Sequence, residues 1–195
     1  TNAEVREAFE RAERGEAKIL SFADVLGLLS TGKQAIVMAG SFGKTTSVSL
    51  MAHCLVSGGL DPSWMIGAVP LSPPSASHVG AGPEILLEGD EYLSSAIDRR
   101  PKFHLYHADI GVISGISWDH INVFPDFGDY VSQFRKFADQ LPESGTLIYC
   151  CEDPEVVAVA NAYSTRAEKI SYGVPAHVIR DGISSLTVPG GEVPL

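Results

Sequence analysis

One short segment has the residue types and spacing of a loop that binds phosphate groups: Gly40, Ser41, Phe42, Gly43, Lys44, Thr45 and Thr46. Glycines let a backbone turn so that successive N–H groups point at phosphate oxygens, and the start of a following helix strengthens this effect. The ammonium group of Lys44 can bridge the β- and γ-phosphates of a nucleotide, and the hydroxyl of Thr45 can ligate Mg²⁺. The strict pattern has glycine where Met38 stands. The alternative is a glycine-rich turn that only joins two elements.

Two acidic motifs follow apolar runs further along the chain. Glu88-Gly89-Asp90-Glu91-Tyr92 comes after the first run, and Trp118-Asp119-His120 comes after the second. Carboxylate oxygens can hold Mg²⁺, and an imidazole can complete the shell of a second cation. The plainer alternatives are that Asp90 and Glu91 are solvated acids and that His120 is a hydrogen-bonded loop residue.

Apolar runs alternate with amphipathic segments, and this alternation predicts the elements that position these motifs. Strands are predicted over residues 17–20, 35–39, 84–88, 109–114, 146–149 and 169–172. Helices are predicted over residues 4–14, 21–32, 44–56, 127–141 and 154–163. Residues 70–83 carry four prolines and are predicted to form a loop. The pattern predicts a doubly wound α/β fold with a mostly parallel sheet, helices on both faces and a short antiparallel C-terminal extension. Both acidic motifs then lie at the carboxyl edge of the sheet, where such folds bind ligands.

Composition narrows the class of protein. The 195 residues are 45% hydrophobic and carry a formal net charge of −10, which disfavours a nucleic-acid or anionic-membrane surface. No apolar run approaches the roughly 20 residues that a membrane span needs. The three cysteines, Cys54, Cys150 and Cys151, have neither disulfide-framework nor zinc-site spacing. They predict a reduced, cytoplasmic protein.

The order of these motifs resembles the central domain of the Mur ligase family. The matching features are G-S-x-G-K-T-T, then E-G-D-E, then D-H after an apolar strand. The resemblance implies that ATP and Mg²⁺ are the cofactors, bound by residues 40–46. It implies catalytic roles for Lys44, Glu88 and His120. Thr45 and Glu88 would hold the first magnesium ion, and His120 the second.

Within the family, Glu88–Tyr92 with the segment Asp98–Phe103 is similar to the branch that joins muramate to a tripeptide. The implied reaction couples the carboxylate of UDP-N-acetylmuramate to the peptide amine through an acyl phosphate, in peptidoglycan recycling. Arg99, Arg100 and Lys102 could neutralise anionic substrates, or could form a solvated basic turn. The alternatives are a UDP-N-acetylmuramate–L-alanine ligase, a folylpolyglutamate-type ligase, a small-molecule kinase and an inactive nucleotide-binding fragment.

The resemblance also predicts domain organisation and departures from the family pattern. Residues 1–33 resemble the tail of an N-terminal UDP-sugar-binding domain, and residues 34–195 resemble the central ATP-binding domain. The remaining N-terminal domain and a C-terminal domain are therefore expected partners. Ser41 replaces a usual threonine, Phe42 a histidine or asparagine, and Gly115 an asparagine. Phe134 stands where other branches place a carbamylated lysine.

Overall fold

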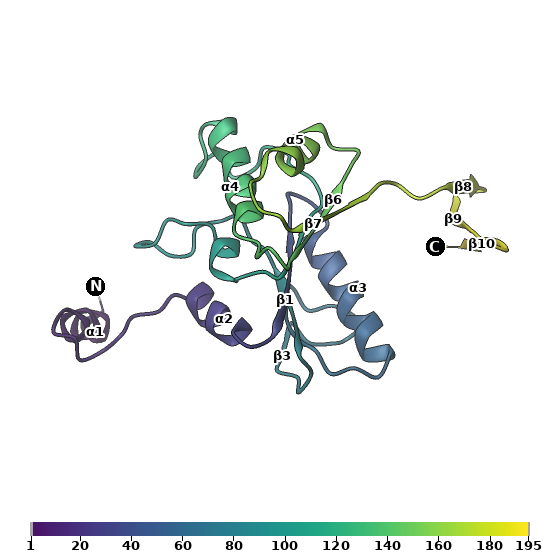
Figure 1. Ribbon diagram of the computed structural model, residues 1–195. Helices are drawn as coiled ribbons and strands as arrows, with labels where there is room; N and C mark the ends of the chain where they lie inside the picture. The colour runs from purple at the N-terminus through teal and green to yellow at the C-terminus, as the bar shows by residue number, and fades with distance from the viewer. Residues whose placement is uncertain (1, 195) are drawn as a thin grey trace.

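The computed structural model describes residues 2–194 (Figure 1). Thr1 and Leu195, at the outer ends of the two predicted domains, lie outside the described residues. The helices are α1 (Ala3–Glu13), α2 (Phe22–Ser30), α3 (Lys44–Ser57), the 3-10 helix η1 (Lys102–Leu105), α4 (Phe127–Asp139) and α5 (Pro154–Ala162). The strands are β1 (Gln34–Ala39), β2 (Ser63–Met65), β3 (Ser77–His78), β4 (Glu84–Glu88), β5 (Ile110–Ile113), β6 (Thr146–Cys150), β7 (Glu168–Tyr172), β8 (His177–Arg180), β9 (Ile183–Val188) and β10 (Gly191–Pro194).

A seven-stranded sheet forms the centre of the molecule, in the order β3-β2-β4-β1-β5-β6-β7. Every neighbouring pair is parallel except β2 with β3. Met38 of β1 pairs with Glu88 of β4, and Ala39 pairs with Ile113 of β5. The ends of β1, β4 and β5 therefore lie together at one edge, which is where the phosphate-loop and acidic motifs begin.

The two faces of the sheet are covered by different helices, and each face has its own buried cluster. Val48 and Ala52 of α3 pack with Trp64, Leu86 and Val112 on one face. The larger cluster on the other face gathers apolar side chains of α2, η1, α4 and α5. Burial on both faces explains why β1 and β4 are nearly continuous apolar runs.

Local sequence fixes where the helices begin. Ser21 and Asp24 form a reciprocal capping box at the start of α2. The side chains of Asp126 and Asp153 accept hydrogen bonds from the first turns of α4 and α5. These caps satisfy N–H groups that a helix leaves without internal partners.

Two parts of the chain extend from this body on opposite sides in Figure 1. Helix α1 has no buried residue, so its apolar side chains Val5 and Phe9 face solvent. Strands β8, β9 and β10 form a separate antiparallel sheet. Helix α2, by contrast, contributes Ala23 and Leu26 to the main core.

The predicted fold class is confirmed, but one predicted element is wrong, and three elements were not predicted: β2, β3 and the short helix η1. Residues 17–20 form no strand: they have no strand to pair with, and Ile19 and Leu20 are both partly exposed. Strands β2 and β3 were not predicted, and β3 lies within the predicted loop 70–83. None of the helices formed by residues 2–194 is both long and apolar enough to span a bilayer.

Candidate nucleotide and metal site

The loop between β1 and α3 leaves the start of α3 open to an anion. Gly40 and Gly43 have φ angles of 126° and 75°, a region that favours glycine. A side chain at Gly40 would also run into the hydroxyl of Ser114. Gly43 caps α3 without any side-chain hydrogen bond, so the first N–H groups of this 14-residue helix keep their donors free for a ligand. The positive end of the helix favours a phosphate there.

Ser41 and Phe42 occupy different environments within the loop. The hydroxyl of Ser41 donates to the carbonyl of Ser117 at 2.7 Å and lies 3.0 Å from the hydroxyl of Tyr130. The Ser41 amide donates to the carbonyl of Gly115. Ser41 thus anchors the phosphate loop to the segment after β5, whereas the ring of Phe42 is exposed.

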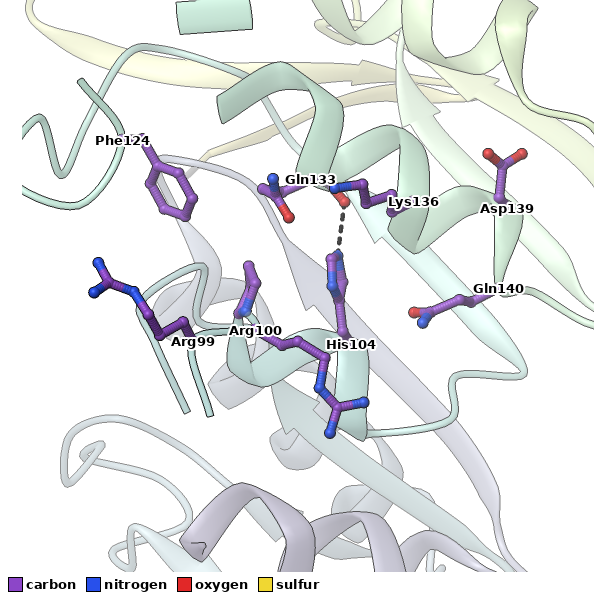
Figure 2. Close-up of a pocket in the computed structure, with 9 residues that line it drawn as sticks. Arg99, Arg100, His104, Phe124, Gln133, Lys136, Asp139 and Gln140 are labelled. Carbon is purple, nitrogen blue, oxygen red and sulfur yellow. Dashed lines mark hydrogen bonds between the residues drawn. The ribbon is translucent and has the colours of Figure 1, made fainter. Parts of the chain in front are cut away.

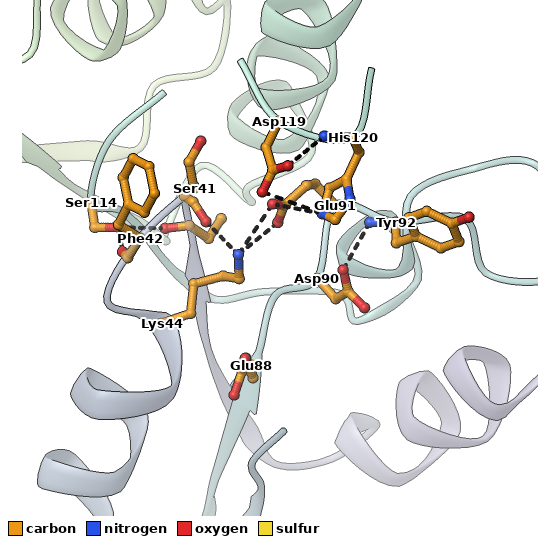
Figure 3. Close-up of polar contacts among 12 residues, drawn as sticks. Ser41, Phe42, Lys44, Glu88, Asp90, Glu91, Tyr92, Ser114, Asp119 and His120 are labelled. Carbon is orange, nitrogen blue, oxygen red and sulfur yellow. Dashed lines mark hydrogen bonds and ion pairs between the residues drawn. The ribbon is translucent and has the colours of Figure 1, made fainter. Parts of the chain in front are cut away.

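Lys44 is held by two acceptors in its own site. Its Nζ donates to the carbonyl of Gly40 at 2.6 Å and to Glu91 Oε2 at 2.9 Å (Figure 3). The Glu91 side chain is fully buried, and only 14% of the Lys44 side chain is exposed. The pair therefore holds the Lys44 ammonium beside the open helix terminus, with its charge compensated by Glu91.

Thr45 and Glu88 form a second polar group, between the first turn of α3 and the end of β4. The Thr45 hydroxyl donates to Glu88 Oε1 at 2.8 Å, and the amide of Gly67 donates to Glu88 Oε2 at 2.8 Å. Gly67 follows β2, so the three elements β2, β4 and α3 position this group. Thr45 retains lone pairs that can ligate Mg²⁺, and Glu88 supplies a carboxylate, so the donor set fits that ion.

A third group joins both acidic motifs. One ligand atom each from Asp90, Glu91 and His120 lies within 4.8 Å of the others. His120 Nε2 is 3.4 Å from Glu91 Oε1. His120 adopts a φ of 55°, which is costly for a residue with a side chain and is a frequent property of functional sites. Two carboxylates and an imidazole form a donor set that a second divalent cation can use.

The Asp90 carboxylate is kept charged. Burial alone would raise the pKa of Asp90, but hydrogen bonds from Lys102 and the Tyr92 amide, with the charges of Lys102 and Lys44, hold that pKa below its ordinary value. Lys102 Nζ lies 2.6 Å from Asp90 Oδ2. Lys102 therefore faces this site, whereas Arg99 and Arg100 face a different cavity.

Phe134 lies in the aromatic core and not in the site. It is fully buried, with its ring centroid 5.2 Å from that of Tyr130 and 5.6 Å from that of Phe103. Tyr130 in turn contacts Ser41. Its pKa is raised by burial, and the charges of Glu91 and Asp119 add to that effect against the Ser41 hydrogen bond.

The structure thus places the predicted metal-binding residues in two separate groups, and each group includes residues that were not predicted to bind metal. Glu88 joins Thr45, while His120 joins Glu91 and Asp90; Glu88 is apart from His120 (Figure 3). From the sequence, Glu91 could also be a solvated acid, and its burial excludes that alternative. Gly67 and Tyr130 were not predicted, because no local pattern in either segment signals a contact with the loop.

A phosphate loop at the carboxyl edge of a doubly wound parallel sheet defines a P-loop-type nucleotide-binding domain. Comparison with known proteins identifies the family to which this domain belongs. The sequence profile of the Mur ligase middle domain matches residues 91–188, and the chain belongs to the Mur ligase family. The UDP-N-acetylmuramate–L-alanine ligase of Xylella fastidiosa strain M12 is 32% identical over 203 residues, covering 98% of this chain and 40% of that protein.

Solved structures have the same fold. The UDP-N-acetylmuramate:L-alanyl-gamma-D-glutamyl-meso-diaminopimelate ligase of Neisseria meningitides gives a TM-score of 0.80 at 20% identity, covering 98% of this chain and 63% of that one. MurF ligase from Thermotoga maritima, solved with ADP, gives a TM-score of 0.63 at 14% identity, over 86% and 42% of the two chains. The chain spans about two fifths of the length of the Xylella relative.

Proposed function

We propose that this chain is the ATP-binding domain of an ATP-dependent carboxylate–amine ligase. The observation that carries the proposal is the position of Lys44 and Thr45 at the open N-terminus of α3, between Glu88 on one side and the Glu91–His120 group on the other. A triphosphate needs N–H donors and a cation, and the two carboxylate groups provide ligands for Mg²⁺. Residues 40–46 would hold the nucleotide, with Lys44, Glu88 and His120 in catalytic roles.

The reaction follows from the charges of this site. A substrate carboxylate attacks the γ-phosphorus of ATP, and ADP leaves as an acyl phosphate forms. The N–H groups of the loop and the ammonium of Lys44 stabilise the negative charge that develops on the transferred phosphoryl group. Magnesium, when bound by Thr45 and Glu88, supplies further positive charge at the phosphates. An amine then attacks the acyl carbon, the tetrahedral intermediate loses a proton, and its collapse releases phosphate and the amide.

We propose UDP-N-acetylmuramate as the carboxylate donor and L-alanyl-γ-D-glutamyl-meso-diaminopimelate as the amine, in peptidoglycan recycling. The basic segment with Arg99, Arg100 and Lys102 supports this assignment, as does the fold of the Neisseria ligase. The second candidate is a UDP-N-acetylmuramate–L-alanine ligase, which the names of the curated sequence relatives favour. A cytoplasmic location, and further N- and C-terminal domains that complete the site, belong to the same proposal.

Calorimetric titration of MgATP tests the nucleotide site. We expect the wild-type chain to bind, and Lys44→Ala to lower affinity at least tenfold, because a charge-assisted hydrogen bond contributes roughly 1.5–3 kcal/mol. Lys18→Ala, a control at an exposed residue outside every group described above, should bind like wild type. Thr45→Val should reduce the dependence of binding on Mg²⁺, whereas Thr45→Ser should retain it. Equal affinity for wild type and Lys44→Ala would overturn the proposal.

A further inference from the structure

A second cavity lies away from the phosphate loop, between helix α4 and the segment that precedes η1 (Figure 2). Its volume is about 710 Å³, which lies within the range of small-molecule sites. One wall carries Arg99, Arg100 and Pro101, and the other carries Gln133 and Lys136 of α4 and its C-cap residue Gln140. We refer to this cavity as the basic groove.

The groove has an excess of positive charge in a strongly acidic chain. Arg99, Arg100 and Lys136 are three of only 14 lysines and arginines in a protein whose formal net charge is −10. Arg99 and Lys136 form no ion pair with any residue in the range 2–194. Two cations that line the same cavity, neither in an ion pair, create a positive potential there, and this potential favours an anionic ligand.

The acids near the groove cancel only part of these charges. Asp139 lines the cavity, and the hydrogen bonds that its Oδ1 accepts from the amide and the hydroxyl of Ser164 do not remove its negative charge. Asp98 pairs with Arg100 at 2.7 Å, so Arg99 and Lys136 together face the single charge of Asp139, and the groove keeps a net positive charge. His104 is buried against the groove, and burial lowers its pKa, so it adds no charge near pH 7.

The donors lie on both walls of the groove, and this arrangement indicates the shape of the ligand. Lys136 and Gln140 are one helical turn apart along α4 and its C-cap, and Arg99 lies on the opposite wall. Gln133 does not add to them, because its Nε2 already donates to the carbonyl of Asp129 and to Ser132 Oγ. Phe124 and Pro101 also line the cavity and offer apolar contacts. Donors on two walls, together with apolar contacts, fit an extended molecule with several carboxylates better than a compact phosphate.

The end of the groove at Phe124 adjoins the proposed catalytic site. The amide of Phe124 donates to the carbonyl of His120 at 2.9 Å, so a single turn joins the groove to the Asp90–Glu91–His120 group. The groove therefore adjoins the chain segment that carries His120.

We propose that the basic groove binds a short acidic peptide through Arg99 and Lys136, and so positions the amine substrate of the ligase. The identification of the peptide as a substrate rests on the proposed function; the binding of an acidic peptide to the groove does not. Arg99 and Lys136 would contact the peptide directly, and both lie outside the phosphate loop.

Peptide titration of the 195-residue chain tests the groove, with L-alanyl-γ-D-glutamyl-meso-diaminopimelate as the probe and trialanine as the neutral comparison. We expect Lys136→Gln and Arg99→Gln each to weaken binding about threefold to fivefold, the effect of losing one exposed ion pair, and the double variant about tenfold or more. Affinity should fall as salt rises. Arg135→Gln is the matched control, because Arg135 is the neighbouring exposed cation on α4 and does not line the cavity.

Each outcome decides the proposal. Selective loss of peptide affinity in the two groove variants, with MgATP affinity unchanged, supports it. Equal affinity in wild type, both groove variants and Arg135→Gln overturns it, as does equal binding of trialanine. A third arm uses inorganic diphosphate: if diphosphate displaces the peptide at lower concentration, the groove is a phosphate site and the proposal is wrong. Loss of MgATP binding in Lys44→Ala with peptide binding retained separates the two sites.

Discussion

The buried pair of Lys44 and Glu91 gives a prediction whose size can be worked from the structure. Lys44 Nζ lies 2.9 Å from Glu91 Oε2. At an effective dielectric constant of 20, two such charges attract each other by about 6 kcal/mol. Most of that is offset by removing both charges from water. The net stability of the pair is therefore small, but the loss of one partner is costly.

Glu91→Gln should lower the free energy of unfolding by about 2–3 kcal/mol. This is below the roughly 3–5 kcal/mol seen for fully buried pairs, because Lys44 remains 14% exposed and still donates to Gly40. For a chain of this length, the melting temperature should fall by about 5–10 °C. Lys44→Met should cost more, about 3–5 kcal/mol, because Glu91 is fully buried and loses its lysine.

The assay is urea unfolding followed by circular dichroism on the two single variants and the double variant. If the two side chains form one buried pair, the double variant should be at least 1 kcal/mol more stable than the sum of the single losses predicts. Glu7→Gln on the exposed helix α1 is the control and should change stability by less than about 0.5 kcal/mol. Losses that add to within 0.5 kcal/mol would show that Lys44 and Glu91 are not coupled, and the reasoning would be wrong.

Two further predictions concern helix α2. Ser21→Ala removes half of the capping box and should cost about 1 kcal/mol at pH 7. The Ser21 amide and hydroxyl hold the pKa of Asp24 below its usual 3.8, so this stability is present above that value and is lost as pH falls through the folded-state pKa. The difference between the melting temperatures of the two proteins should therefore shrink in acid, and the part that comes from the Ser21 hydroxyl accepting from the Asp24 amide should remain. Gly27→Ala should destabilise by about 1–3 kcal/mol in urea, because a Cβ would collide with the rigid carbonyl of Leu105. Gly58→Ala should cost less, because its Cβ would lie 3.3 Å from the nearest backbone oxygens.

The sequence was sufficient to predict the elements that are buried on both sides. Ala35–Ala39 is an unbroken apolar run, and β1 lies at the middle of the sheet. Strand β2 has only three residues, too few to display a period, and β3 has two. Residues 17–20 have the composition of a strand but no partner, and partners are a property of the tertiary fold.

Some features of the candidate site could likewise be predicted from the sequence, and others could not. Position at a strand end was enough to predict Glu88 beside the loop, because parallel strands end at a common edge. The burial of Glu91 and the inward hydroxyl of Ser41 could not be predicted. The Ser41 hydroxyl contacts Tyr130, which lies on α4 and is 89 residues from Ser41 in the chain. A contact over such a separation leaves no local pattern in the sequence.

The charges of the site link its resting state to its proposed ligand. Lys44 is the cation of the phosphate loop, and in this structure its charge is already compensated by Glu91. Glu88, Asp90 and Asp119 add further negative charge at the same edge, of which Lys102 balances only that of Asp90. A bare triphosphate would meet repulsion there, whereas divalent cations bound by these carboxylates would reverse it. We therefore expect the proposed nucleotide binding to be coupled to metal binding and to release of Lys44 from Glu91. The double-variant cycle measures the coupling between these two side chains that such a release would break.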